Sequence, residues 1–248
     1  MASIPECISG KEMMEIEVKD KNHMGTVTIQ NRTTIDPITC IGEEAGICWG
    51  ANVEDKEANY KRGIDCIKCN HGRAMEFPSI YLVISGYSSK VIREFYTHIV
   101  GNSRLQASTR YIDYSKQFDS VIPHSIANNE EATKVWNEYM VNVAPTIQKL
   151  KEIGVPTEDA TNVLPLAYST KIVVKMSLRS LMNMAEMRLC TRAYWEYREL
   201  MSDILTELAK YSAEWEELIY DLKVFVPKCE KAGFCVESKC CGRKPKKQ

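Results

Sequence analysis

The chain has 248 residues, of which 44% are hydrophobic and 26% charged, and its formal net charge is −1 at pH 7. This length suits one large domain or two small ones with a sizeable core, and the near-neutral charge argues against a nucleic-acid partner. No apolar run reaches the length of a membrane span and residues 1–11 lack an export-signal pattern, so we expect a cytoplasmic protein without a membrane partner.

The N-terminal third predicts strands and one helix. Apolar and polar residues alternate over residues 14–18 and 27–29, which predicts two half-buried strands. A Cys- and Gly-rich stretch covers residues 40–52, and residues 55–69 have a helical pattern. The nearly all-apolar run over residues 80–84 is typical of a strand that is buried on both faces.

The middle of the chain predicts two helices. Ser88 and Ser89 have side chains that favour helix N-caps, and we expect Gly101 to end the helix that begins there. Apolar residues recur at helical spacing over residues 130–151, and Gly154 is expected to close this longer helix.

The last third predicts one more strand, more helix and a tail. Residues 168–176 contain a strand pattern, and residues 178–222 are largely helical with a break near Thr191. From Pro227 onward the chain is rich in Cys, Gly and Lys, and we expect it to be irregular.

These elements predict an α+β fold, because helices and strands are interspersed without a regular βαβ series. We expect a single mixed domain over residues 1–226, with a small, mostly antiparallel sheet flanked by long helices. Residues 227–248 would form a separate Cys- and Lys-rich C-terminal tail.

A dense polar block lies over residues 103–111 and contains two arginines, hydroxyls, an amide and a phenol. If residues 108–111 are extended, Ser108 and Arg110 point to one face, where a hydroxyl and a guanidinium suit a phosphate group. The alternative interpretation is a solvated polar loop.

Arginines also recur along the helix expected after residue 178. Arg179 and Asn183 are four residues apart and share one face, whereas Arg188 lies about 140° around the helix from Asn183. The two faces would serve different ligands or different ends of one site. The alternative is surface arginines above a core of methionines.

The ten cysteines allow a metal site but do not require one. Cys66, Cys69 and His71 have a spacing found in zinc sites, and four cysteines of the tail could add thiolates: Cys229, Cys235, Cys240 and Cys241. A single Cys-x-x-Cys is a weak signal and the tail spacings are irregular, so we predict free thiols and no metal.

Four blocks of sequence resemble the flavin-dependent thymidylate synthases, and most closely a divergent branch associated with clostridia. The blocks are Gly46–Trp49 with Arg62–Cys66; His71–Arg73 with Glu76–Pro78; Ile92–His98 running into Arg104–Tyr111; and Val163–Leu166 with Leu178–Asn183, Met187–Arg188 and Ala193–Glu196. Their order and spacing cover about three-quarters of the chain.

The resemblance implies an enzyme that methylates dUMP to dTMP without a protein nucleophile. Members of the family bind FAD, dUMP, methylenetetrahydrofolate and NADPH, and the reduced flavin delivers the hydride that completes the methyl group. They are homotetramers whose active sites are shared between subunits.

The same resemblance assigns site residues. Arg188 falls on the arginine that activates the uracil ring and is the expected catalytic residue. The positions expected to bind dUMP are Glu94, Thr97, Gln106, Ala107, Ser108, Thr109, Arg110, Thr161 and Arg188. The positions expected to bind FAD are Met75, Thr97, His98, Ile99, Gln106, Ser177, Leu178, Arg179 and Asn183.

Two departures from the family pattern concern charge. The family's Arg-His-Arg is degraded: His98 falls either on its histidine, with one residue inserted, or on its first arginine. Thr97 and Ile99 supply no guanidinium, and Arg104 is a candidate for replacing a lost cation. Thr161 stands where an arginine usually grips the phosphate, so Arg73 or Lys171 would have to compensate. These losses favour one alternative, a non-catalytic flavin or nucleotide binder with the same fold. The cysteines and the Lys-rich end, Arg243–Lys247, favour another, a zinc-bearing interaction module.

Overall fold

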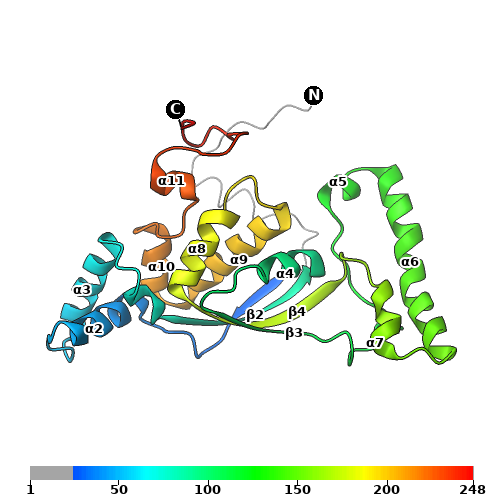
Figure 1. Cartoon of the computed structure of the whole chain (residues 1–248), viewed down its shortest axis with the longest axis horizontal. Coiled ribbons are helices and arrows are strands. Elements are labelled where there is room, and N and C mark those ends of the chain that lie inside the picture. The colour runs from blue at the N-terminus through cyan, green and yellow to red at the C-terminus, as the bar shows by residue number, and fades with distance from the viewer. Residues whose placement is uncertain (1–24, 248) are drawn as a thin grey trace.

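The structure is a computed structural model that describes residues 25–247, so the strand expected over residues 14–18 lies outside the described residues. A small sheet lies at the centre, with helices over one face, a helical hairpin at one end and a helical arm at the other (Figure 1). This arrangement confirms the expected α+β class.

The sheet is formed by four antiparallel strands in the order β1-β2-β4-β3. They are β1 (Thr26–Ile29), β2 (Ser79–Ser88), β3 (Asn102–Gln106) and β4 (Ser169–Ser177). The strands expected over residues 27–29, 80–84 and 168–176 are therefore confirmed. The edge strand β3 lies inside the polar block and was not predicted, because its side chains lack an apolar alternation.

One face of the sheet forms the main core together with the helices above it. Alternate side chains of β2 and β4 are at most 1% exposed on this face: Ile80, Leu82, Ile84, Ile172, Val174 and Met176. The helices that cover the sheet are α4 (Ser89–Phe95), α8 (Leu178–Arg188), α9 (Trp195–Tyr211) and α10 (Ala213–Tyr220) (Figure 1). The period of two along the strands thus fixes which face the helices cover.

Serine caps set where these helices begin. The Ser88 hydroxyl accepts a hydrogen bond from Val91 N–H at 3.2 Å, which confirms the expected N-cap of α4. The break expected near Thr191 is also present, between α8 and α9. A second break, not predicted, falls at Ser212, whose hydroxyl caps α10.

The end of α4 corrects one expectation, because the helix stops at Phe95 and not at Gly101. The guanidinium of Arg104 donates to the carbonyl oxygens of Tyr96 and His98 at 3.1 and 2.7 Å. A cation that satisfies the last carbonyls of a helix ends it favourably, and this cation comes from β3.

The hairpin consists of α2 (Pro37–Cys48) and α3 (Lys56–Lys68). The helix expected over residues 55–69 is confirmed, whereas α2 lies in the stretch read only as Cys- and Gly-rich. Its glycines serve close packing: a Cβ on Gly42 would lie 1.7 Å from the Asn59 carbonyl oxygen, and one on Gly63 would lie 2.0 Å from the Ile38 carbonyl oxygen.

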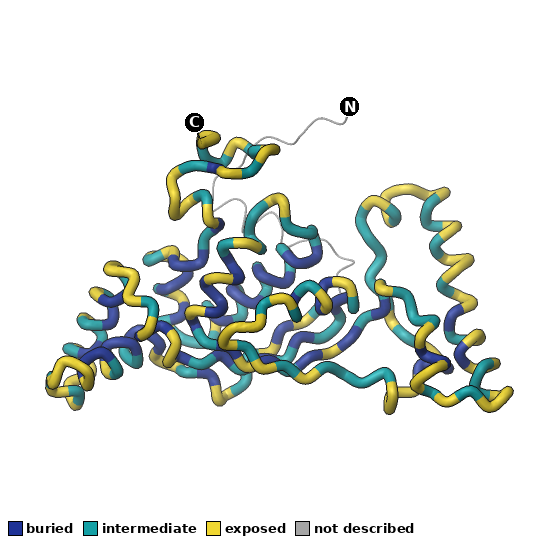
Figure 2. Tube along the Cα trace, viewed as in Figure 1, coloured by how far each residue is buried: buried dark blue, intermediate teal, exposed yellow. Residues whose placement is uncertain are grey.

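The arm comprises α5 (His124–Ala127), α6 (Glu130–Glu152), α7 (Thr157–Ala160) and the 3-10 turn η2 (Thr161–Val163). The long helix expected over residues 130–151 is confirmed as α6. A separate small core joins the arm to the sheet through Tyr114, Val143, Ile147, Ala160 and Tyr168. Most of the first half of α6 is exposed (Figure 2).

The remaining elements are the 3-10 turn η1 (Ala74–Glu76) and the short helix α11 (Lys228–Ala232), which ends at Gly233 with a φ of 77°. The tail is therefore not irregular throughout. None of the helices formed by residues 25–247 is both long and apolar enough to cross a membrane.

Candidate active site

Arg188, the last residue of α8, lies against the end of α4 and is surrounded by polar partners. Its guanidinium donates to Glu94 Oε2 at 3.0 Å, to His98 Nε2 at 3.0 Å and to Thr97 Oγ1 at 3.3 Å. The Arg188 side chain is 16% exposed, so these contacts are well shielded from water. Four of the expected site residues therefore come together in one cluster.

The contact with Arg188 requires a neutral His98, because Nε2 must accept a hydrogen bond. Burial, together with the nearby cations Arg188 and Arg104, lowers the pKa of His98 to about 4. His98 is therefore uncharged at neutral pH, and its proton lies on Nδ1.

Tyr197 of α9 forms the floor of this cluster and was not among the expected site residues. The Arg188 guanidinium lies 4.4 Å from the centre of its ring, and the His98 ring meets it edge-on at 6.1 Å. Tyr197 is fully buried, and its hydroxyl has no hydrogen-bond partner of good geometry among the described residues. Burial raises the pKa of this hydroxyl, so it can act only as a neutral group.

A second group of expected residues lines a pocket of about 520 Å³ on the other face of α8. Met75, Arg179 and Asn183 contribute to it, as the shared helix face of the last two predicts. Arg179 also pairs with Glu76 at 2.5 Å. Arg188 is not part of this lining, which agrees with its different position around the helix.

Two residues with unusual backbone conformations line the same pocket. Asn70 and Lys223 have φ values of 53° and 49°, and they are the non-glycine residues with positive φ within the described part of the chain. Asn70 follows the C-cap of α3 and Lys223 follows the end of α10, so both stand at helix C-termini, where left-handed backbone is common. Lys68 and Lys231 also line the pocket, so its wall carries several cations.

The start of α8 places two more expected residues in structural roles. The Ser177 hydroxyl accepts a hydrogen bond from Ser180 N–H at 3.2 Å as the N-cap. Leu178 is fully buried and donates its N–H to the Pro78 carbonyl oxygen at 2.9 Å. By contrast, Ile99 is 71% exposed in the single chain.

The third group lies at the base of the arm and corrects the expected geometry of residues 108–111. These residues form a turn and not an extended segment: Tyr111 N–H donates to the Ser108 carbonyl oxygen at 3.3 Å, and Arg110 N–H donates to Ser108 Oγ at 3.2 Å. The Arg110 side chain pairs with Glu158 of α7 at 2.8 Å. Ser108 and Arg110 are close because of this turn and not because of strand alternation.

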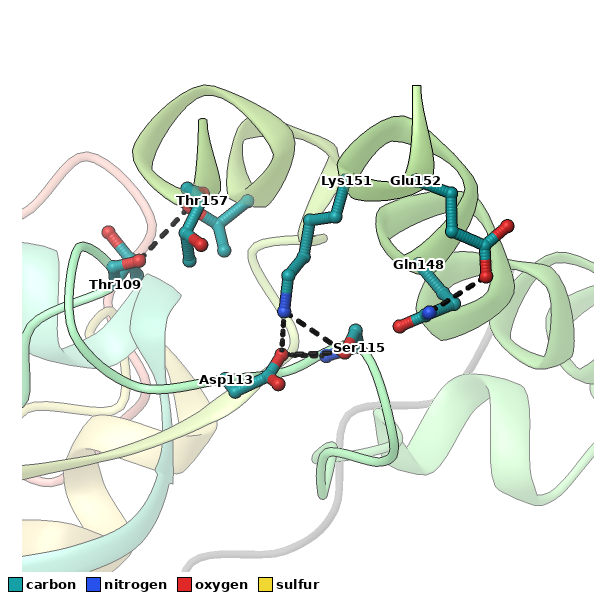
Figure 3. A network of polar contacts seen from close by, with 8 residues as sticks. Thr109, Asp113, Ser115, Gln148, Lys151, Glu152 and Thr157 are labelled. Carbon is teal, nitrogen blue, oxygen red and sulfur yellow. Dashed lines mark hydrogen bonds and ion pairs between the residues drawn. The ribbon is translucent and has the colours of Figure 1, made fainter. Parts of the chain in front are cut away.

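Thr161 lies directly against this turn. Its hydroxyl is 3.2 Å from the Thr109 carbonyl oxygen and 3.0 Å from the Thr157 carbonyl oxygen, so it already makes hydrogen bonds to the backbone. Nearby, Lys151 donates to Asp113 at 2.8 Å (Figure 3), and this contact holds the pKa of Asp113 below its usual range. These contacts tie the turn to the arm.

The link between the groups runs along β3. Gln106 Nε2 is 3.4 Å from Thr170 Oγ1, and the Ala107 N–H donates to the Lys171 carbonyl oxygen at 2.8 Å. Arg104 is engaged at the end of α4, which gives it a structural role. Within one chain, the arm lies beyond the end of the sheet that is distant from the pocket on α8 (Figure 1).

The cysteine motif at the end of α3 is split between the interior and the surface, since Cys66 is 2% exposed and Cys69 is exposed. Among residues 25–247, no three His, Cys, Asp or Glu side chains are gathered closely enough to hold a metal ion.

Comparisons with known proteins all match one family. Residues 32–212 match the family described as thymidylate synthase complementing protein. The chain is 32% identical over 193 residues to the flavin-dependent thymidylate synthase of Nitratidesulfovibrio vulgaris, an alignment that covers 73% of this chain and 75% of that protein. It is 34% identical over 172 residues to the enzyme of the same name from Thermococcus onnurineus, covering 67% and 68% of the two chains.

Proposed function

We propose a function for this chain from its family, because it belongs to the flavin-dependent thymidylate synthases. It methylates dUMP to dTMP with methylenetetrahydrofolate as the one-carbon donor. FAD, when bound and reduced by NADPH, supplies the hydride that completes the methyl group. The family assignment also makes the chain a methyltransferase. We place it in the cytoplasm.

The arrangement around Arg188 carries this proposal. A guanidinium that is held by Glu94, Thr97 and a neutral His98 keeps its charge at any physiological pH. A cation fixed in a shielded site stabilises the negative charge that develops on the uracil ring when its C5 becomes nucleophilic. Arg188 is therefore the proposed catalytic residue, and Glu94 and Thr97 bind the nucleotide beside it.

The pocket on α8 supports FAD binding. Its cations suit the diphosphate of a dinucleotide, and two of them, Arg179 and Lys231, would exchange their partners Glu76 and Glu186 for it. Arg179 and Asn183 would contact the cofactor directly, whereas Met75, which is only 1% exposed, would support the pocket wall. Ser177 and Leu178 would hold the start of α8 in place beside the cofactor, because Leu178 is buried and both N–H groups donate to carbonyl oxygens of the chain. Thr97, His98, Ile99 and Gln106 would approach the flavin from another chain.

The turn at the base of the arm supports phosphate binding. Ser108 and Arg110 offer a hydroxyl and a guanidinium, with the Thr109 and Ala107 backbone beside them. Glu158 pairs with Arg110 in this structure and has to release it when the phosphate binds. Thr161 contributes position and not charge, because its hydroxyl already contacts carbonyl oxygens.

A homotetramer with shared active sites supports the same function. Ile99 and Val100, in the loop before the edge strand β3, are 71% and 86% exposed, and Leu105 within β3 is 76% exposed. Large apolar groups exposed on one surface are typical of a protein interface. A neighbouring chain could then bring its Arg110 turn to the Arg188 cluster.

The first experiment is to titrate dUMP into the purified protein while recording the visible absorption of bound flavin. We expect flavin bands that shift on dUMP addition, and dTMP formation once folate and NADPH are supplied. A shift without dTMP would favour the alternative of a non-catalytic binder, which the occupied hydroxyl of Thr161 also favours. A protein that takes up no added FAD would contradict the proposal.

A further inference from the structure

The C-terminal segment, residues 227–247, folds back over the end of α8 that carries Arg188. Lys231 pairs with Glu186 at 2.7 Å, and the Arg243 guanidinium donates to the Leu189 carbonyl oxygen at 3.3 Å. Figure 1 shows this segment above α8. It therefore touches the element that positions the proposed catalytic residue.

This segment has almost no hydrophobic core of its own. Between residues 228 and 247, Cys235 is the buried residue, with 6% of its surface exposed. Its backbone joins two parts of the segment, because its N–H donates to the Pro245 carbonyl oxygen at 2.7 Å and its carbonyl oxygen accepts from Lys247 N–H at 2.8 Å. Small segments with so little apolar burial are usually stabilised by a covalent or metal cross-link.

Thiols gather where such a cross-link would lie. Four of them line one pocket of about 390 Å³ together with Arg188: Cys190, Cys229, Cys235 and Cys241. The side chain of Cys240 is in contact with that of Cys235, and its sulfur accepts a hydrogen bond from Gly242 N–H at 3.4 Å. Cys190 comes from the loop after α8, so the cluster joins two distant parts of the chain.

The ionisation of these thiols differs within a few residues. The Glu237 N–H lowers the pKa of Cys235, but desolvation and the thiols of Cys240 and Cys241 outweigh it, so the pKa is raised. Desolvation alone would raise the pKa of Cys241, but Thr191 and Arg243 outweigh it and lower the pKa. The cluster thus contains a more acidic thiol, Cys241, close to a less acidic one, Cys235.

We propose that Cys235 and Cys240 form a dithiol site that a low-molecular-weight disulfide oxidises to an intramolecular disulfide. One thiolate attacks the S–S bond of the small disulfide, which forms a mixed disulfide and releases one small thiol. The second protein thiol attacks the mixed disulfide and releases the other small thiol. Two electrons and two protons leave the pair, and the small disulfide is reduced to two thiols.

The contact between the two sulfur-bearing side chains selects this pair from the cluster. A link between residues 235 and 240 would close the loop that faces α8 and fix its shape beside Arg188. The segment would then have the cross-link that its small core lacks. This inference does not depend on the proposed function.

The test uses the full-length protein and oxidised glutathione. The reduced chain should show ten free thiols after denaturation, and oxidation should leave eight. Trypsin cleaves after Lys239, so a disulfide should join the peptides 232–239 and 240–243 in mass spectrometry.

Variants assign the link to one pair. Cys240→Ser should abolish the linked peptide, whereas Cys241→Ser, which changes the neighbouring thiol, should retain it. Cys69→Ser, at an exposed site outside the cluster, should still lose two thiols on oxidation. The proposal is wrong if the thiol count stays constant, if Cys241→Ser and not Cys240→Ser removes the link, or if the chain contains one equivalent of zinc that protects the thiols.

Discussion

At the scale of single residues, the geometry around Arg188 predicts how the loss of its charge changes the reaction rate. We expect Arg188→Ala to lower dTMP formation by about 10²–10³-fold, the usual effect of removing one preorganised charge-stabilising group. Flavin binding should persist, because Arg188 does not line the pocket on α8. Steady-state kinetics and the flavin spectrum measure the two effects separately.

Arg188→Lys is the matched control for this substitution. It keeps the charge but cannot donate to Glu94, Thr97 and His98 together, so its activity should lie between those of the native protein and the alanine variant. If Arg188→Ala retains full activity, Arg188 is not the catalytic cation.

The low pKa of His98 makes stability depend on pH. Because the pKa falls from about 6.5 in the unfolded chain to about 4 in the folded chain, the unfolded state binds more protons between these values. The contribution of His98 is therefore complete above about pH 6.5 and is lost as the pH falls towards 4. The slope is at most about 1.4 kcal/mol per pH unit, and less because the ring is only partly buried.

Urea unfolding at pH 7, 6 and 5 measures this dependence. The native protein should lose more unfolding free energy over this range than His98→Asn, which cannot be protonated. His71→Asn, at an exposed histidine, is the control and should follow the native protein. Identical curves for the native protein and His98→Asn would show that His98 is not held neutral by its neighbours.

The relative positions of the site residues were predicted best where helical spacing determines which face they share. The shared face of Arg179 and Asn183, and the different face of Arg188, followed from helical spacing alone. Tyr197 could not be found in this way, because its role depends on how α9 packs beneath α4. The extended conformation considered for residues 108–111 was wrong, because a hydrogen bond from Arg110 N–H to the Ser108 hydroxyl stabilises a turn instead.

At the scale of elements, the α2–α3 hairpin depends on two glycines. Gly63→Ala should destabilise the protein by about 1–3 kcal/mol, the range for overpacked interiors, because the new Cβ would overlap the Ile38 carbonyl oxygen. In a free helix the same change would be stabilising by up to about 1 kcal/mol, so the sign of the effect is diagnostic.

Thermal and urea unfolding report this change. Lys61→Ala, on the exposed side of α3, is the control and should alter stability by less than about 0.5 kcal/mol. A stabilised Gly63→Ala would mean that α2 and α3 do not approach as closely as the structure shows.

Elements were predicted where periodicity is strong, as in α3, α6, β2 and β4. The helix α2 was missed because its glycines suggest a loop, although Pro37 at its first turn and the buried Ile38, Ile41 and Ala45 follow a helical pattern. The glycines are there for contact with α3, which no local signal reveals. The strand β3 was missed for a similar reason, because pairing with β4 and not its own apolar content makes it a strand.

At the scale of the whole molecule, the three groups of site residues do not come together within one chain. The Arg188 cluster and the pocket proposed for FAD flank α8, whereas the Arg110 turn lies at the base of the arm (Figure 1). A single chain that spread one nucleotide site so widely would bind poorly. The division of the chain into a domain over residues 1–226 and a tail stays a prediction, although the tail contacts α8.

Subunit mixing tests whether neighbouring chains complete each site. Arg188→Ala and Arg110→Ala should each be inactive or nearly so as homo-oligomers. When the two chains are co-expressed with different tags and purified through both, a site that draws Arg188 from one chain and Arg110 from another can be intact. With random assembly, about one quarter of such sites contain both arginines, so about a quarter of native activity should return.

The double variant, with both substitutions in one chain and co-expressed with the native chain, provides the matched comparison. It should also give about a quarter of native sites if each site draws on two chains, but about half if each site lies within one chain. Sites confined to one chain would therefore show no recovery in the first mixture and half activity in the second. Recovery in the first mixture would place Arg188 and Arg110 of different chains at one nucleotide, which the separation between α8 and the arm leads us to expect.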